Sequence, residues 1–521
     1  MLINRFVVHR VVFFIALMFL LVGIPFCRPF MSIGGILLVA NWFLEGDFVR
    51  KWYQTKNNKL LFIVLLFFFV YLMGLVYTEN YPQAWKSIWL KIPLFFIPVI
   101  FATTKPLSTI EFHNLLKVYI VGVLISSVYG FIHYHQNDLI DKREIAVYIS
   151  YIRFEMNLCL AVFISLYLLQ KEKYRWQQCL LLIYLAWIFY LIIYVGALTA
   201  LIMLVLSFCV LLLKKAFEKK DRLHRILLPL VFLLGISGAI LYTYVLVKNY
   251  YTVDFDAHKA DVSTVDGNSY VHDTNCMLIE NGSYVYTYVC ELELKEAWDQ
   301  RSRLPYNGMD IHNEHTIKNT LMRYLNSKGL RKDRVGVESL SDNDIKNIEN
   351  GIANVAYVSL MGYKSRLYGL LWELSDYKKN KVVSGYTLPQ RIELWKNALL
   401  LIKQQPLLGV GSGDINDAFA RQLLISDSPL KNTNKLCHNQ FLLFFIGFGV
   451  VGFFVIMFSI LYPFIKRKAY RYDLFLIFML IMFFSMMTDD TLERQDGLTL
   501  FAFFNAYFLF LMPFFPEKKR E

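Results

Sequence analysis

The chain has 521 residues, of which 56% are hydrophobic and 18% are charged, and its formal net charge is +13. An ordinary globular protein is about 45–50% apolar and about 25% charged, so this composition excludes disordered, collagen-like and small disulfide-rich proteins. The apolar residues form long blocks with charges at their edges, which argues against a soluble enzyme. The positive charge suggests nucleic acid at first, but its distribution favours a different explanation.

The apolar blocks lie at residues 11–46, 59–77, 88–104, 115–134, 147–169, 178–213, 226–248, 438–464, 473–489 and 497–515. A transmembrane helix needs about 20 mostly apolar residues, so the first and sixth blocks are too long for one span. Pro25, Arg28 and Pro29 divide the first block. Basic residues flank both ends of the sixth block, which makes it a hairpin of two spans. The sequence therefore predicts an all-α polytopic membrane protein with about 12 transmembrane helices.

The positions of the basic residues predict the orientation of these spans, because basic residues mark cytoplasmic segments. The segments assigned to that side hold Arg5, Arg10, Arg50, Lys51, Lys56, Lys59, Lys105, Lys171, Lys173, Arg175, Lys214, Lys215, Lys219, Lys220, Arg222, Arg225, Lys466, Arg467, Lys468, Arg471, Lys518, Lys519 and Arg520. The short segments on the other side hold Arg28, Lys86, Lys142, Arg143 and Arg494. We therefore expect both termini in the cytoplasm and no nucleic-acid partner. The first block continues into a second span without a small-residue cleavage site, so a cleavable signal is not expected.

The layout divides the chain into a membrane domain at 1–248 with spans 1–9, a large polar loop at 249–437, and spans 10–12 at 438–521. The alternation of sides places the loop outside the cytoplasm. A β-rich run at 283–289 follows the turn sequence Asn281-Gly282, which predicts a hairpin. Helical spacing begins at Ile317 and ends before Gly329, and Ser341 with Asp344 predicts a capping box. We therefore expect a mixed α/β loop, whose last helix runs from 388 to 404.

Cys276 and Cys290 lie in this loop, where an oxidising compartment would permit a disulfide. The two residues are not opposite each other about the Asn281-Gly282 turn, so a bridge and two free thiols both stay open.

Two residues near the end of the loop are candidates for chemistry. Arg391 lies in the first turn of the helix at 388–404, where its guanidinium adds to the positive end of the helix and favours a phosphate or diphosphate. The alternative is an arginine that extends to lipid headgroups. His438 lies at the extracytoplasmic mouth of a span, where it is suited to act as a general base or to serve only as a polar anchor.

Gly409, Gly411 and Gly413 lie between these two residues. Asp414 occupies the position of the third glycine of a dinucleotide fingerprint, and no Gly-Lys-Ser/Thr follows, so neither nucleotide motif is present. A tight turn that returns the loop to the membrane is the better interpretation.

Several charges lie within or beside the predicted spans. Arg153 and Lys91 are inside spans, where charged residues usually face a cavity or a partner. Asp489, Asp490, Glu493 and Arg494 form the short loop between the last two spans, on the predicted outer side.

His312 and His315 make an H-x-x-H pair near Asp310 and Glu314. The pair lacks a convincing third ligand, so we expect a solvated surface and no metal site.

The segment from 389 to about 460 resembles the signature of the O-antigen ligase family, which includes O-antigen polymerases and protein O-oligosaccharyltransferases. The matching residues are Arg391, Trp395, Pro406-Leu407-Leu408-Gly409-Val410-Gly411-Ser412-Gly413-Asp414, His438-Asn439, and Gly447, Gly449 and Gly452 in the following span. The predicted layout, with one large outer loop late in the chain, is similar too.

The resemblance implies a metal-independent glycosyl transfer on the periplasmic face of the bacterial inner membrane, without a cofactor. The donor would be a glycan on undecaprenyl diphosphate, and a ligase would transfer it to a sugar hydroxyl of lipid A–core or another glycan. By the family pattern His438 would be the catalytic base or position the acceptor, and arginines such as Arg391 would bind the diphosphate. Asn439, Lys91, Glu493 and Arg494 are possible supporting residues.

One departure from the family pattern concerns an arginine. Family members often carry Ser-Arg at the start of the span that we place at 196–213, but this chain has Tyr194-Val195-Gly196-Ala197. Arg153 is our candidate substitute, and Arg366 is a weaker one. A polymerase and a protein O-oligosaccharyltransferase remain alternatives to a ligase. A glycolipid transporter is less favoured, because the sequence shows no internal repeat.

Overall fold

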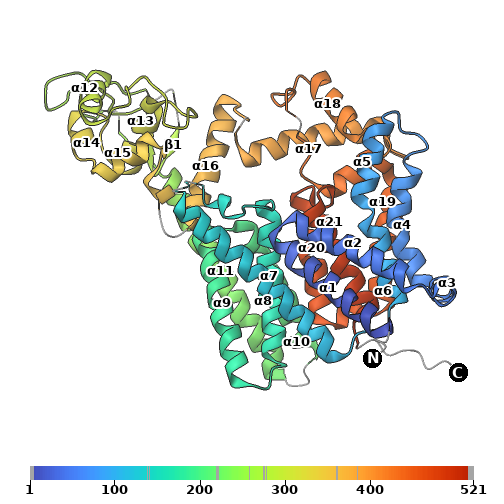
Figure 1. The fold of residues 1–521 in the computed structure, drawn as a ribbon. Coiled ribbons are helices and arrows are strands. Elements are labelled where there is room, and N and C mark those ends of the chain that lie inside the picture. Colours follow the sequence, from blue (N-terminus) through green and yellow to red (C-terminus); the bar gives the residue numbers. More distant parts are fainter. Residues whose placement is uncertain are drawn as a thin grey trace. The chain divides into compact units, whose positions relative to one another are not determined.

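Figure 1 shows the computed structural model of the chain. It describes residues 5–513 except 138, 140, 219–221, 257, 274, 275, 277, 359–361, 384 and 434. The described residues are mainly helical, with one two-stranded hairpin, which confirms an all-α polytopic protein. Packing divides the chain into two units, and each is described by itself. Unit 1 comprises Met1–Ile192, Thr199–Leu211 and Arg391–Glu521, and unit 2 comprises Ile193–Leu198 and Leu212–Gln390. Which residues lie outside the membrane stays a prediction.

Eight helices of the described residues are long and apolar enough to cross a membrane. They are α1 (Arg5–Phe26), α5 (Tyr81–Lys91) continued by α6 (Pro93–Thr103), α7 (Thr109–Gln136), α8 (Tyr151–Leu169), α9 (Arg175–Val195), α10 (Leu198–Glu218), Pro229–Tyr251 of α11 (Arg222–Tyr251), and α19 (Gln440–Lys466). A ninth is reached if α2 (Arg28–Glu45) and α3 (Phe48–Asn57), bent by 111°, count as one span. The structure therefore does not support the predicted count of 12.

The difference comes from apolar blocks that are longer than the helices inside them. In the block 59–77, α4 (Lys59–Met73) ends four residues before the block does, and the residues after it form a turn. Likewise α20 (Asp473–Thr488) has 16 residues. At 1.5 Å per residue it is about 24 Å long, less than the bilayer core of about 30 Å. The last block forms α21 (Gln495–Ala506) and a π-helix at Tyr507–Leu511.

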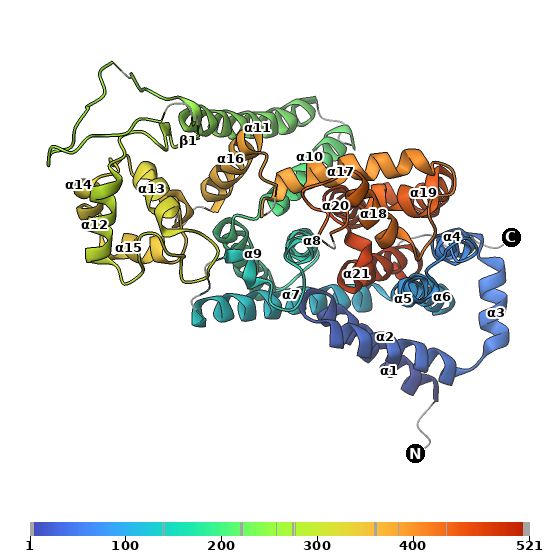
Figure 2. The same cartoon turned by 90° about the horizontal axis from the view of Figure 1, so that it is seen from above.

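The core of unit 1 is built around α21. Every residue from Asp496 to Ala506 is buried, as expected for a helix that is surrounded on all sides. Aromatic rings supply much of this packing: Phe504 lies 4.9 Å from Tyr119 and 5.8 Å from Phe478, between ring centroids. Figures 1 and 2 show α8, α20 and α21 side by side. The site described below lies at one end of this core.

The glycine cluster packs against a break in α19. Gly449 has φ 60° and ψ −165°, which interrupts the helix. The backbone N–H groups of Val410 and Gly411 donate to the carbonyls of Ile446 and Gly447, each at 2.9 Å. A Cβ at Gly409 would lie 2.5 Å from the carbonyl carbon of Gly447. The close approach of two backbones therefore explains why glycine is needed here.

Unit 2 contains α11, β1 (Ile279–Glu280), β2 (Ser283–Tyr284), α12 (Glu291–Arg301), α13 (Ile317–Ser327), α14 (Arg334–Glu338), α15 (Asp342–Glu349) and α16 (Gly362–Asn380). The capping box of Ser341 with Asp344 is confirmed, and Gly329 follows α13 with φ 70°. The turn at Asn281-Gly282 joins β1 to β2 in antiparallel register.

The expected mixed α/β loop is not supported, because its strands have only two residues each. Tyr288 has φ 52°, which ends any extended run, and Val285 and Val289 are buried. Val289 is part of the core that α12, α13 and α15 form, so its side chain packs against helices, while its backbone makes only isolated bridges with Val271 and Lys332. The helix expected at 388–404 is confirmed as α17 (Thr387–Gln404), while α18 (Ile415–Ile425) was not predicted.

All seven cysteines are free, so Cys276 and Cys290 form no bridge. Asp310 accepts hydrogen bonds from the backbone N–H groups of His312, Glu314 and His315, so the H-x-x-H pair lies in a turn and not on a helix. Of the residues used for orientation, Lys219, Lys220, Lys518, Lys519 and Arg520 lie outside the described residues.

The break in α19 gives a stability prediction. Gly449→Ala should lower the free energy of unfolding by roughly 2 kcal/mol or more, because its φ is positive and the new Cβ would lie 2.2 Å from the carbonyl of Leu407. Gly35→Ala is the matched control, since nothing lies within 4 Å of its added Cβ. Thermal unfolding in detergent measures both. Equal unfolding temperatures for the two variants would contradict this explanation of the glycine.

Candidate functional site

The candidate site lies where four chain segments of unit 1 meet. These are the first turn of α8, the residues before α19, the end of α20 and the start of α21. A short 3₁₀ turn at Thr491–Glu493 joins α20 to α21. The site residues therefore come from segments that are far apart in sequence.

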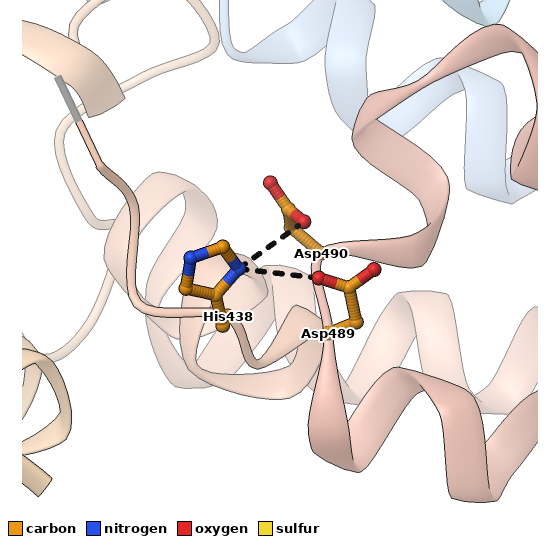
Figure 3. Close-up of side chains that lie close together, drawn as sticks. All are labelled: His438, Asp489 and Asp490. Atoms are coloured by element: carbon orange, nitrogen blue, oxygen red, sulfur yellow. Dashed lines mark hydrogen bonds and ion pairs between the residues drawn. The ribbon is translucent and has the colours of Figure 1, made fainter. Parts of the chain in front are cut away.

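His438 is the centre of the site (Figure 3). Its Nδ1 lies 3.2 Å from Oδ1 of Asp489 and 3.7 Å from Oδ1 of Asp490. The other ring nitrogen points away from both carboxylates. The side chain is 32% exposed, whereas those of Asp489 and Asp490 are 4% and 11% exposed. The Nδ1 edge of the imidazole is thus held by the carboxylates of Asp489 and Asp490, and the other ring nitrogen is directed away from them.

The backbone around His438 is held in place on both sides. The indole N–H of Trp395 in α17 donates to the carbonyl of Cys437 at 2.8 Å. The side chain of Asn439 caps α19 by accepting from the N–H groups of Phe441 and Leu442. His438 itself has φ 46°, a left-handed conformation. These contacts fix the direction in which the imidazole leaves the chain.

Arg153 contacts both aspartates that face the imidazole. It is 3% exposed and forms an ion pair with Asp489. It also lies 3.7 Å from Oδ1 of Asp490 and 4.0 Å from Oδ1 of Asp496. Its Nη2 donates to the carbonyl of Asp490, and its Nη1 donates to Oγ of Ser150, both at 2.9 Å. A charged residue in a span needs a partner, and the partner of Arg153 is the loop between α20 and α21.

A second buried pair fixes the other end of that loop. Nζ of Lys91 is fully buried, lies 3.0 Å from Oε2 of Glu493 and donates to the carbonyl of Leu492 at 2.5 Å. Gln440 donates to Glu493 at 2.9 Å and accepts from the N–H of Leu492 at 2.8 Å. Tyr71 donates to the same carboxylate at 3.2 Å. The loop is therefore tied to α4, α5, α8 and α19.

These contacts set the charge of the histidine. The hydrogen bond to Asp489 and the neighbouring Asp490 raise the pKa of His438 to about 9, against the opposing effect of burial. Burial works against the ionised form of Asp490, but its contacts with His438 and Asp489 and the charge of Arg153 outweigh burial and hold the pKa of Asp490 well below its usual range. At neutral pH the imidazole of the free protein is therefore protonated.

The same three side chains are also spaced as metal ligands. One ligand atom from each of His438, Asp489 and Asp490 lies within 4.8 Å of the others. Two of the three already form an ion pair with Arg153, which supplies the positive charge that a metal would otherwise provide. The donor set therefore has an internal counter-ion, and our expectation of no metal stays a prediction.

The predicted site residues have different positions. Arg391 is half-buried and lies one helical turn before Trp395, on the same side of α17. Arg494 is exposed and is the N-cap residue of α21. Arg366 is in unit 2, where it donates to Oγ1 of Thr387 at 3.2 Å. The roles assigned to these arginines stay predictions.

Sequence reasoning did not assign roles to Asp489, Asp490, Asp496 or Gln440. The useful signal was the need of Arg153 for a counter-ion, together with two adjacent aspartates in a short loop on the same predicted side. No sequence pattern indicated a role for Gln440, because that residue contacts the backbone N–H of Leu492 in the loop.

The raised pKa of His438 gives a direct prediction. Asp489→Asn should lower this pKa from about 9 by roughly one to two units, because the hydrogen bond from Nδ1 then reaches a neutral amide. The pH dependence of diethylpyrocarbonate labelling of His438, followed by peptide mass spectrometry, measures it. Glu493→Gln is the matched control, since that carboxylate pairs with Lys91 and not with His438. An equal shift in both variants would contradict the assignment.

A comparison with known protein families covers His438 but not Arg153, Asp489 or Asp490. Residues 351–457 match the sequence profile of the family described as O-antigen ligase. The chain is also 38% identical over 79 residues to an uncharacterized protein of Haemophilus influenzae. That alignment covers 15% of this chain and 20% of the relative. The family match and the long apolar helices point to a multi-pass bacterial membrane protein. The family match, over residues 351–457, supports membership of the O-antigen ligase family.

Proposed function

We propose that the protein is a ligase-type glycosyltransferase of the bacterial inner membrane. It moves a glycan from undecaprenyl diphosphate to a sugar hydroxyl of lipid A–core on the periplasmic face. The observation that carries this proposal is the imidazole of His438, which two buried carboxylates orient from one side at the mouth of α19. The family match covers this residue and supports the class of reaction.

The reaction replaces one bond to the anomeric carbon of the donor with another. The bond from this carbon to the diphosphate oxygen breaks, and the electron pair leaves with the diphosphate. The acceptor oxygen forms the new bond to the same carbon, and its proton passes to the free ring nitrogen of His438. Diphosphate is already a good leaving group, so the protein needs mainly to stabilise its charge and to accept this proton.

The carboxylates orient the imidazole and also make it a stronger base. With a pKa of about 9, roughly 1% of His438 is unprotonated at pH 7, which costs about 2.7 kcal/mol relative to a fully available base. A stronger base offsets part of this cost, because its driving force for proton transfer is larger. The proposal therefore assigns to Asp489 and Asp490 an effect on both the geometry and the proton affinity of His438.

Arg391 is the proposed ligand of the diphosphate. It lies in the first half of α17, one turn from the tryptophan that holds Cys437 next to His438. A planar guanidinium suits two phosphate oxygens at once. Arg153 is nearly enclosed by the loop between α20 and α21, so its contacts favour a positioning role over direct contact with the donor. Lys91 and Glu493 act in the same way, through the other end of the loop.

A transfer assay with purified protein, lipid-linked glycan and lipid A–core tests the proposal. His438→Ala should lower the rate of transfer by about 10²- to 10⁴-fold, the usual range for loss of a general base. Arg391→Ala should lower it by at least about tenfold, because a charge-assisted contact with the leaving group is lost. The reaction should continue in the presence of EDTA.

Two variants serve as matched controls. His312→Ala removes a histidine from an exposed turn, and Arg421→Ala removes an exposed arginine from α18. Both should transfer at the rate of the unaltered protein. Unchanged transfer in His438→Ala and Arg391→Ala would refute the site. Loss of activity with EDTA, restored by a divalent cation, would refute a metal-independent reaction. Lengthening of the glycan on its polyprenyl carrier, without transfer to lipid A–core, would show a polymerase, and transfer to a protein hydroxyl would show a protein O-oligosaccharyltransferase.

A further inference from the structure

A second charged pocket of unit 1 lies far from His438. Lys105 follows α6, and the N–H of Leu107 donates to the carbonyl of Leu511 at 3.2 Å. Leu511 is at the end of the helical segment that begins with Gln495 beside the candidate site. This segment is roughly 20 Å long, so the pocket and His438 are at opposite ends of the buried core.

The pocket brings together basic residues from three separate segments. Arg10 comes from α1, Arg50 from α3 and Lys105 from the turn after α6, and all three line the same cavity. The orientation rule assigned each of these segments to the cytoplasmic side, and here they share one surface. The pocket therefore gathers three basic side chains, together with the carboxylate of Glu45, on one surface.

Two of these cations are already neutralised, and one is not. Arg10 makes two hydrogen bonds of 3.0 Å to Glu111, and Arg50 lies 2.6 Å from Asp47. Lys105 is exposed, and the structure shows no ion pair for it among the described residues. The pocket therefore presents an ammonium group at its edge that can accept an anion.

The rest of the lining is partly apolar. Phe6 is 59% exposed, and Phe13, Leu38 and Ile100 line the same cavity. A cavity with cations at its edge and apolar walls fits a molecule that has an anionic group joined to hydrocarbon. A free inorganic anion would use only one part of it.

Helix α3 beside the pocket has the properties of a helix that lies on a membrane surface. It turns 111° away from α2 and has 10 residues, about 15 Å, which is too short to span. Figure 2 shows it at the edge of the unit. Its exposed face carries Phe48, Val49, Trp52 and Tyr53, with exposures of 51%, 86%, 69% and 61%. Exposed aromatic residues among basic ones are typical of an interfacial helix.

The attachment of α3 to the pocket is firm. Lys51 is 2% exposed and lies 2.8 Å from Oε2 of Glu45. Its Nζ donates to the carbonyl of Trp42 at 2.5 Å and lies 4.7 Å from the centre of that indole ring. Trp42 and Glu45 also line the pocket, so the position of α3 and the shape of the pocket are linked.

We propose that this pocket binds the phosphate group of an anionic phospholipid from the cytoplasmic leaflet, while α3 lies in the headgroup layer beside it. Basic pockets between helices on that side of a membrane are suited to anionic headgroups. The proposal rests on the predicted orientation of the basic residues and is independent of the glycosyl transfer.

The test uses the full chain in nanodiscs, with and without about 30% phosphatidylglycerol in phosphatidylcholine. We expect phosphatidylglycerol to be retained after extraction into detergent and counted by native mass spectrometry, and to raise the thermal unfolding temperature. Lys105→Gln should weaken this retention roughly fivefold, about 1 kcal/mol, the effect of one basic residue at an anionic surface. Lys466→Gln is the matched control, since this exposed lysine at the end of α19 is assigned to the same side but does not line the pocket.

Selective weakening by Lys105→Gln, with Lys466→Gln unchanged, supports the proposal. Equal weakening by both variants would show diffuse surface charge and no pocket. Equal stabilisation by inorganic phosphate would show an anion site and not a lipid site. Retention that neither variant changes, or that is equal for phosphatidylcholine, would overturn it.

Discussion

The arrangement of the candidate site depends on the burial of Arg153. An arginine that is 3% exposed cannot lose its charge, and burying an unpaired ion costs several kcal/mol. The loop between α20 and α21 meets this requirement with Asp489 and Asp490, and Asp496 in the first turn of α21 adds a third carboxylate. The same two adjacent aspartates then face His438. The charge that balances Arg153 therefore also orients the histidine and raises its pKa to about 9.

The other parts of the site fix the position of this short loop. Lys91 fixes its far end through Glu493 and a backbone carbonyl, and Gln440 joins the same carboxylate to the first turn of α19. Behind the loop, α21 is buried on all sides and packs against aromatic rings. Gly409 and Gly411 pack against the break in α19, the helix that begins just after His438. A charged loop on a rigid aromatic core is a suitable support for a proton-transferring residue.

The sequence predicted most of the individual parts but few of the contacts between them. Apolar blocks and proline positions located the helices, yet they overestimated the spans, because turn residues such as Leu75 and Val76 are as apolar as helix residues. The charge in a span indicated that Arg153 needs a partner, but Asp490 lies 337 residues away, and periodicity carries no information on such pairs. His438 was found from its place at the mouth of a span and from the family resemblance. Its partner Asp489 was not assigned, because a pairing over 51 residues depends on how α19 and α20 pack. The β-rich run at 283–289 predicted strands that the structure does not have, since Val289 packs against helices.

We propose that the carboxylates held by Arg153 make His438 the base of glycosyl transfer. The pH dependence of kcat/KM for transfer tests it most directly, because this ratio reports the ionisation of the free enzyme. If the neutral imidazole accepts the proton, kcat/KM should rise about tenfold per pH unit from pH 7 and level off near pH 9, the pKa of His438. A value of kcat/KM that is constant between pH 7 and 8 and falls above pH 9 would contradict the claim, since the protonated imidazole would then be the active form.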